Sequence, residues 1–263
     1  MSNGSGAAVT GLVIGVIMAL GALSPDDSNP SSENAADSTN GTGSGSGSGD
    51  SSAGSSDGTG WGLDVPGVIR TTGRGGQTVA LTFSAGPDGR YTPDILAILG
   101  AEGIKATFCV IGSAAEENPD LVRQIAAEGH VLCNHTMNYD YALAARDDAT
   151  IRAEIDGGLA AIRAAVPDAS VPFFRTPGGN FSPTLVSVAS SSGMASLGWN
   201  VDPRDWTTPG VAAIQSAVVD AVQPESIVVL HDGGANRTQT VDALPGIIDE
   251  LAAEGYNFVT PAS

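Results

Sequence analysis

The segment Ala80–Leu96, ALTFSAGPDGRYTPDIL, contains the features that decide the fold of this chain. It begins with apolar and β-branched residues typical of a buried strand, turns at a Gly-Pro pair, and continues as a helix from a Thr-Pro pair. A strand that ends in a tight turn beneath a helix is where α/β proteins usually hold their functional groups. Yet this strand ends in Ser84 and Ala85, which neither bind a metal well nor accept a proton at neutral pH.

The same alternation of short strands and helices continues to the end of the chain. Strands are predicted at Thr78–Phe83, Ala106–Ile111, His130–Cys133, Pro172–Arg175, Ala195–Trp199, Ile227–Leu230 and Tyr256–Val259. Helices are predicted near Pro93–Gly100, Pro119–Gly129, Ala149–Val166, Pro183–Gly193, Gly210–Val222 and Val241–Glu254. Alternation at this spacing implies a parallel sheet covered by helices, either open or closed into a barrel.

The composition divides the chain of 263 residues into three parts. Residues 1–23 include a short apolar run typical of a signal peptide or a minimal membrane anchor, although no Lys or Arg precedes it. Residues 24–60 form a Ser- and Gly-rich tract with little to bury, which predicts a disordered linker. Residues 61–263 form the folded domain. We therefore expect a secreted or cell-surface protein, with cleavage or anchoring left open.

The net charge of the chain limits the classes of molecule that it is expected to bind. The formal net charge is −18, which argues against nucleic acid and against anionic lipid as ligands. Contact with a membrane is expected only through the N-terminal segment.

Cys109 and Cys133 both lie in apolar, strand-like runs. An exported pair can form a disulfide, but adjacent parallel strands are a poor place for one, and small buried thiols are common. Both alternatives stay open.

Polar side chains follow five of the predicted strands. They are Ser84, His135, Arg175, Asp205 with Trp206, and His231 with Asp232. Because the carboxyl ends of parallel strands meet at one edge of a sheet or one mouth of a barrel, these side chains are expected to converge. Convergence of so many polar groups predicts a binding or catalytic site.

These segments, in this order, resemble the five motifs of the polysaccharide deacetylases, carbohydrate esterase family four. The matching stretches are TFSAGPDGRYTP for TFDDGP and its Tyr-Thr-Pro helix start, NHTMNY at Asn134–Tyr139, RTPGG at Arg175–Gly179, DPRDW at Asp202–Trp206, and VVLHD at Val228–Asp232. The resemblance implies a distorted (β/α) barrel of about seven parallel strands. It also implies a groove for N-acetylated glycans such as peptidoglycan or chitin-like chains.

The resemblance further implies a mechanism. In the family a divalent metal, usually zinc, is held by the second Asp of the first motif and both His of the second, and it activates a water. The first Asp takes the proton of that water, an Arg of the third motif orients the Asp, and the His of the fifth motif protonates the leaving amine. An Asp of the fourth motif holds that His.

This chain departs from the family at the metal. His135 matches the first metal-binding His, but Tyr139 stands at the position of the second. Ala85 replaces the Asp that binds the metal, and Ser84 replaces the base. Tyr139 would have to bind as a phenolate, and the ordinary pKa of about 10 opposes that.

The other half of the family's set is retained. Arg175 matches the Arg that orients the base, His231 the general acid and Asp205 its partner. Trp206 matches the tryptophan of the groove, so Trp206, Tyr139 and Arg175 are expected to contact the glycan. Since Arg175 lacks its carboxylate, we hypothesise that Arg175 and His231 bind an acidic ligand, such as a muramic or uronic acid group.

Three functions follow from these residues. In the first, the protein binds an N-acetylated glycan, without hydrolysing it, or a protein partner, and it needs no cofactor. In the second, it is an active glycan N-deacetylase that holds zinc or another divalent metal with rearranged ligands; Asp88 and Asp140 could serve only if the backbone moved. In the third, Ser84 is a nucleophile activated by His231 and Asp205, although the family geometry places Ser84 and His231 far apart.

Overall fold

The computed structural model describes residues 65–263, so the predicted signal or anchor (1–23) and linker (24–60) lie outside the described residues. The strands are β1 Val68–Ile69, β2 Thr78–Gly86, β3 Thr107–Val110, β4 Val131–Asn134, β5 Phe173–Phe174, β6 Ala195–Leu197, β7 Ser226–His231 and β8 Asn257–Phe258. The α-helices are α1 Thr92–Ala101, α2 Gly112–Glu117, α3 Pro119–Ala127, α4 Asp148–Ala165, α5 Pro183–Ser191, α6 Val211–Val219 and α7 Thr238–Ala253. Short 3-10 turns are η1 Leu143–Ala145, η2 Pro177–Gly179 and η3 Asp205–Thr207. None of the helices within residues 65–263 has the length and apolarity needed to cross a membrane.

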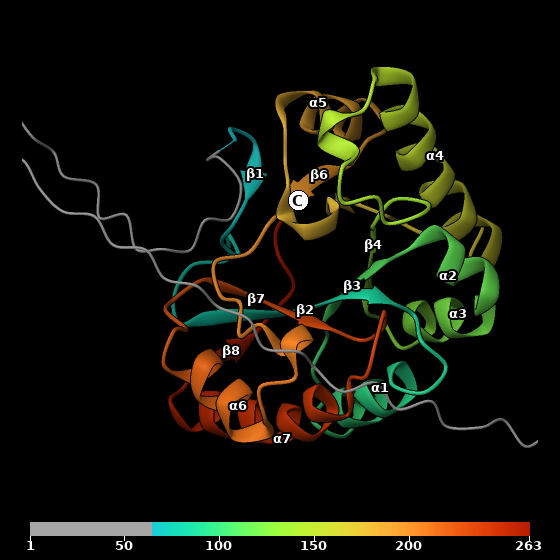
Figure 1. The fold of residues 1–263 in the computed structure, drawn as a ribbon. Helices are drawn as coiled ribbons and strands as arrows, with labels where there is room; N and C mark the ends of the chain where they lie inside the picture. The colour runs from blue at the N-terminus through green and yellow to red at the C-terminus, as the bar shows by residue number, and fades with distance from the viewer. Residues whose placement is uncertain (1–64) are drawn as a thin grey trace, which may run out of the picture. The chain divides into compact units, whose positions relative to one another are not determined.

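The strands form a curled parallel sheet in the order β1-β6-β5-β4-β3-β2-β7, with β8 beside the start of β2. Helices lie outside this sheet, with α2, α3 and α4 on one flank and α6 and α7 on another (Figure 1). The chain that leaves β6 reaches the far edge of the sheet, because Val201 forms a parallel bridge to Val228 of β7. The predicted fold class, a distorted (β/α) barrel of about seven parallel strands, is confirmed.

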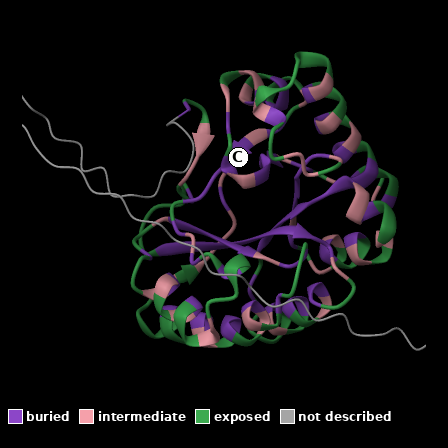
Figure 2. Cartoon of the chain, viewed as in Figure 1, coloured by how far each residue is buried: buried purple, intermediate pink, exposed green. Residues whose placement is uncertain are grey.

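Alternate residues of each strand enter different cores. On β2, Val79, Leu81 and Phe83 face the helices and belong to the larger core. Ala80 faces inward and joins a smaller core inside the barrel, together with residues of neighbouring strands. Strands β2 to β7 are buried almost throughout, whereas each helix buries one face and exposes the other (Figure 2). The side chains of Thr82 and Ser84 continue the inward row of β2 toward the carboxyl end of the sheet.

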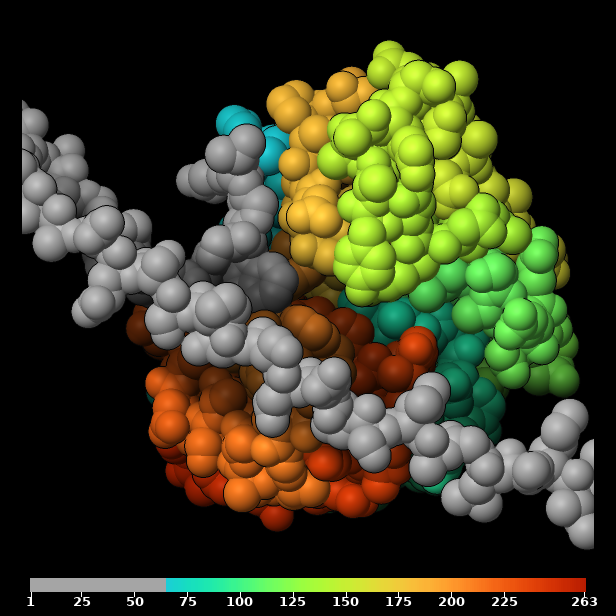
Figure 3. Space-filling model, viewed as in Figure 1, coloured from blue at the N-terminus to red at the C-terminus, as the bar shows by residue number. Residues whose placement is uncertain are grey.

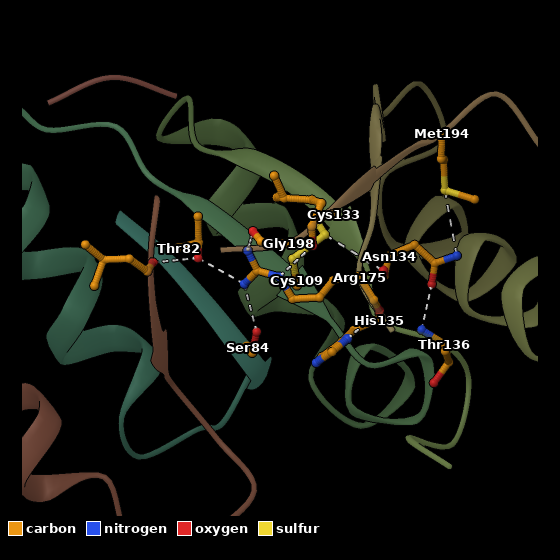
Figure 4. Close-up of a disulfide and its surroundings, with 12 residues drawn as sticks. Thr82, Ser84, Cys109, Cys133, Asn134, His135, Thr136, Arg175, Met194 and Gly198 are labelled. Atoms are coloured by element: carbon orange, nitrogen blue, oxygen red, sulfur yellow. Dashed lines mark hydrogen bonds between the residues drawn. A yellow bond between two sulfur atoms is a disulfide. The ribbon is translucent and has the colours of Figure 1, made fainter. Parts of the chain in front are cut away.

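The disulfide Cys109–Cys133 joins two neighbouring strands on the inner side of the barrel, and neither cysteine is free (Figure 4). The two residues are register partners on the parallel strands β3 and β4, with their Cα atoms 4.2 Å apart. The sequence argument that neighbouring parallel strands are a poor place for a bridge is therefore wrong for this pair. Both side chains point into the smaller core, where their Sγ atoms face each other.

The predicted elements differ from the observed ones mainly at their ends. Strand β2 runs on to Gly86, and Ala85 adopts a left-handed backbone with φ of 68°. Helix α2 was not predicted, because its six residues are too few to show a helical period. Helix α7 continues through Pro245, which the sequence rules for helices disfavour.

Candidate functional site

A cavity of about 680 Å³ opens at the carboxyl ends of the strands. Its lining includes Ser84, Ala85, His135, Tyr139, Arg175 and His231. Figure 3 shows the surface hollowed between the yellow-green atoms of the segment after β4 and the orange and red atoms of the segments after β6 and β7. The predicted strand-end residues thus converge at one mouth, except that Asp205 and Asp232 lie outside the lining.

His135 follows β4, and its ring is held by the backbone of Arg175, which follows the neighbouring strand β5. Its Nδ1 atom lies 2.7 Å from the backbone oxygen of Arg175, which only accepts, so Nδ1 carries the proton. Burial, aided by the charges of Arg175 and His231, lowers the pKa of His135 to about 3 although the bond to the Arg175 oxygen opposes this. The ring is therefore neutral, and its buried Nε2 atom has no hydrogen-bond partner.

The segment that carries His135 is fixed to helix α4. The buried Asn134 donates from Nδ2 to the oxygen of Ile155 at 2.7 Å and accepts from the backbone N–H of Thr136 at 3.0 Å. A Cβ atom on Gly158 would lie 2.4 Å from Oδ1 of Asn134, so only glycine permits this close approach of helix and loop. The direction of His135 is thus set by α4.

The two other metal positions of the family offer no suitable donor. Ala85 has no ligand atom. Burial, followed by a hydrogen bond with Tyr141, raises the pKa of Tyr139 above its ordinary value, and the charges of Arg175 and Arg237 oppose this only in part. Tyr139 therefore stays a neutral phenol at physiological pH, which is a poor ligand for zinc.

The carboxylates named as substitutes are held elsewhere. Asp140 forms an ion pair with Arg146 at 2.7 Å, and Asp88 accepts from the backbone N–H of Arg90 at 2.8 Å. Neither lines the cavity. Within residues 65–263, no three His, Cys, Asp or Glu side chains are placed to hold a metal ion together. The residues present at this site do not fit the family's zinc.

Arg175 lines the cavity and is buried, with a relative exposure of 1%. It donates from Nε to the oxygen of Leu197, from Nη1 to the hydroxyls of Thr82 and Ser84, and from Nη2 to the oxygen of Gly198, at 2.9–3.2 Å. All four acceptors are neutral. Burial accordingly lowers the pKa of Arg175 to about 9.

His231 and Asp205 form the strongest polar pair of the site. Nδ1 of His231 lies 2.7 Å from Oδ1 of Asp205, whose Oδ2 accepts from the His231 backbone N–H and from the Thr240 hydroxyl. Burial alone raises the pKa of Asp205, but these bonds and the charge of His231 outweigh it, so the pKa is lowered. Asp205 is thus an anion that fixes the His231 ring.

No hydrogen bond joins Ser84 to His231 in the described part of the chain. The two residues are register partners on β2 and β7, but Ser84 Oγ accepts from Arg175 and His231 is directed to Asp205. A nucleophilic serine requires contact with its base. The third hypothesis, a Ser-His-Asp hydrolase, has no geometric support here.

Two exposed aromatic side chains border the same cavity. Tyr141 and Trp206, with relative exposures of 62% and 43%, are the exposed large hydrophobic side chains within residues 65–263. Tyr141 packs edge-on against Tyr139 with ring centroids 5.1 Å apart, and the guanidinium of Arg204 lies 5.2 Å from the ring of Trp206. Trp206 was expected from the sequence, whereas Tyr141 was not, because only the fold brings it to the mouth.

The sequence also missed two charged residues of the lining, Asp202 and Arg237. Arg237 immediately precedes helix α7, where the helix dipole disfavours a cation, and this is the signal that could have singled it out. Asp202 accepts from the backbone N–H of Arg204 at 2.7 Å, and burial raises its pKa.

Asp232 does not line the cavity; its side chain packs against Gly86 at the end of β2 and Thr92 at the start of α1. Its Oδ2 accepts from the Thr92 hydroxyl at 2.8 Å, and its Oδ1 has no partner. A Cβ atom on Gly86 would lie 2.1 Å from Oδ2, so glycine is required where β2 ends. Burial raises the pKa of Asp232 to about 7.

Comparison with known proteins agrees with this geometry. The profile of the family Polysaccharide deacetylase matches residues 72–197. A chitooligosaccharide deacetylase of Sinorhizobium fredii is 38% identical over 205 residues, which cover 74% of this chain and 94% of the relative. A peptidoglycan-N-acetylglucosamine deacetylase of Bacillus cereus is 41% identical over 186 residues, covering 70% and 86%.

Solved structures give the same assignment. A family CE4 pseudoenzyme from Bacillus anthracis superposes with a TM-score of 0.68 at 27% identity, covering 74% of this chain and 67% of that one. A mutant described as that type of pseudoenzyme with restored enzymatic activity superposes equally well. On its motifs, its fold and these relatives, the chain belongs to the polysaccharide deacetylase family.

Proposed function

We propose that this protein binds an N-acetylated glycan at the mouth of its barrel and does not deacetylate it. The observation that carries the proposal is the metal position: His135 presents one ligand atom, Ala85 presents none, and Tyr139 is a neutral phenol. A catalytic zinc site needs three protein ligands and an open position for water. With Ser84 at the position of the base, the proton acceptor for that water is missing as well.

The glycan-binding part rests on the aromatic rim. Tyr141 and Trp206 expose large ring surfaces at a cavity whose lining also includes polar side chains such as Arg175 and His231. Sugar rings pack on such surfaces through their apolar C–H faces, while the polar side chains can bond hydroxyl and acetamide groups. The named relatives act on chitooligosaccharides and peptidoglycan N-acetylglucosamine, which supports the same ligand class for this chain.

Export is part of the proposal. The disulfide Cys109–Cys133 supports it, because such bonds persist mainly in oxidising compartments. The apolar run within residues 1–23 supports it from the sequence.

An active N-deacetylase is the second candidate, and the retained half of the machinery favours it. Arg175 is retained at the position of the Arg that orients the base, and the His231–Asp205 pair is retained at the positions of the general acid and its partner. This candidate requires metal ligands other than the side chains found at the cavity within residues 65–263.

Acetate release from acetylated chitooligosaccharides, with added zinc or cobalt, tests the proposal. The natural chain is compared with the triple variant Ser84→Asp, Ala85→Asp, Tyr139→His, which restores the family's residues. We expect no release by the natural chain and measurable release by the triple variant. Turnover by the natural chain would establish the second candidate instead.

A further inference from the structure

The cavity contains two buried guanidinium groups and lacks carboxylates to pair with them. Arg175 and Arg237 are both buried and both line the cavity. Neither forms an ion pair within residues 65–263, where the arginine ion pairs are Arg123–Asp120 and Arg146–Asp140. Buried cations are normally paired, because an unpaired charge loses its hydration without compensation.

Of these two, Arg237 has donors to spare. Four of the five N–H groups of Arg175 already donate to neutral acceptors within the protein. Arg175 therefore acts on a ligand in the cavity mainly through its positive charge and not through hydrogen bonds. Arg237 donates from Nε to the oxygen of Gly233 at 2.8 Å and from Nη1 to the oxygen of Asn236 at 3.5 Å. Its Nη2 atom has no acceptor in the described part of the chain.

Nη2 of Arg237 lies beside the position that lost its carboxylate. A Cβ atom built on Gly234 would be 3.4 Å from Cβ of Ala85 and 3.8 Å from Nη2 of Arg237, so the two groups border the same glycine. Tyr139, Arg175 and Arg237 all line the same cavity. An aspartate at position 85, as the family has, would reach toward this guanidinium.

Little on the protein itself compensates this charge. Asp202 is the one acidic residue among those lining the cavity, and it is bonded to the Arg204 backbone rather than to either arginine. Asp205 is paired with His231. An anion from outside would therefore complete the site.

We propose that the position vacated at Ala85 binds the carboxylate of an acidic N-acetylated sugar, with Nη2 of Arg237 as its main donor. The inference rests on the proposed function, since it needs the metal position to be free of metal. It differs from the sequence hypothesis, which assigned the acidic ligand to Arg175 and His231. The sugar ring would lie toward the exposed side chains of Tyr141 and Trp206.

Calorimetric titration in the presence of a chelator tests this proposal with three probes. N-acetylmuramic acid and N-acetylglucosamine differ by one lactyl carboxylate, and D-lactate carries that carboxylate without a ring. We expect N-acetylmuramic acid to bind about tenfold more tightly than N-acetylglucosamine, since bonds to charged groups are the stronger ones. D-lactate should bind more weakly than N-acetylmuramic acid, and equal binding would overturn the assignment to a sugar.

Three variants make the test specific. Ala85→Asp supplies an internal carboxylate and should abolish the preference for the acidic sugar, whereas Ala85→Gly, which leaves the space open, should keep the preference. Both residues tolerate the left-handed backbone at position 85. Arg237→Gln should also abolish the preference.

Equal affinity of the natural chain for the two sugars would overturn the inference, and so would a preference that survives in Ala85→Asp. Acetate release is measured on the same samples. Its presence would overturn the proposed function together with this inference. Its absence, combined with no preference for the acidic sugar, would overturn the inference alone.

Discussion

Nδ1 of His135 donates to the backbone oxygen of Arg175 at 2.7 Å, and this bond fixes the orientation of the ring and leaves Nε2 unprotonated. The one retained metal-type histidine therefore keeps the geometry of a ligand, with a free lone pair on Nε2. What the site lacks is the rest of the ligand set, not the orientation of this residue.

His135 is predicted to stay neutral in mild acid. Its pKa, lowered to about 3 by burial, leaves the ring uncharged at pH 5, where an ordinary histidine with a pKa of 6.5 is mostly protonated. The chain has three histidines, so imidazole ¹⁵N spectra can be assigned with single His→Gln variants. We expect an Nδ1–H tautomer for His135 at pH 5; a doubly protonated ring at that pH would contradict the description of the site.

Asp232 is predicted to make stability depend on pH. Its folded pKa of about 7 lies above the unfolded value of 3.8, so between these values the folded state holds a proton that the unfolded state releases. This contribution to the free energy of unfolding is full below pH 3.8 and is lost as the pH rises through 7, by at most about 1.4 kcal/mol per pH unit.

The variant Asp232→Asn isolates that effect. Urea denaturation at pH 4 and pH 7 should show the variant gaining stability relative to the natural chain as the pH rises. His135, whose lowered pKa acts in the opposite direction, is present in both proteins and cancels in the difference. A difference in unfolding free energy that does not change with pH would refute the assignment to Asp232.

The disulfide is predicted to stabilise the domain substantially. It joins residues 24 apart in sequence, and the loss of such a closed loop costs about 3 kcal/mol by the chain-entropy estimate. The variant Cys109→Ala, Cys133→Ala keeps the inner core apolar and should lower the denaturation midpoint. Reduction with dithiothreitol should lower the midpoint of the natural chain but not that of the variant. Equal midpoints for the natural chain and the variant in the absence of reductant would contradict this prediction.

The aromatic rim is predicted to contribute to glycan affinity. Tyr141→Ala and Trp206→Ala should each weaken binding of N-acetylated chitooligosaccharides about fivefold, corresponding to roughly 1 kcal/mol of ring contact. Tyr141→Phe, which keeps the ring, should bind nearly as the natural chain does. Because both side chains are exposed, the denaturation midpoint should not change. Undiminished affinity in both Ala variants would remove the rim from the binding site.

Most of the fold followed from local patterns, because strand and helix periods and the Pro and Gly signals are properties of neighbouring residues. The pairing of Cys109 with Cys133 did not follow, since it depends on the register of β3 against β4. Helix α2 was too short to show a period.

Some residues of the candidate site could likewise be predicted from the sequence, and others could not. Residues at strand ends, such as His135 and Arg175, could be placed from the sequence, because parallel strands end together. Tyr141 and Arg237 could not, because each reaches the cavity from a loop or helix start whose direction is set by tertiary packing. The donor count at the metal position was already clear in the sequence, but the raised pKa of Tyr139 depends on its burial in the fold.

The measurement that tests the central claim most directly is the zinc content of the purified protein after dialysis against zinc and removal of the free ion. We predict far less than one zinc per chain for the natural protein and close to one for Ser84→Asp, Ala85→Asp, Tyr139→His. Stoichiometric zinc in the natural chain would contradict the claim that its metal site has been lost.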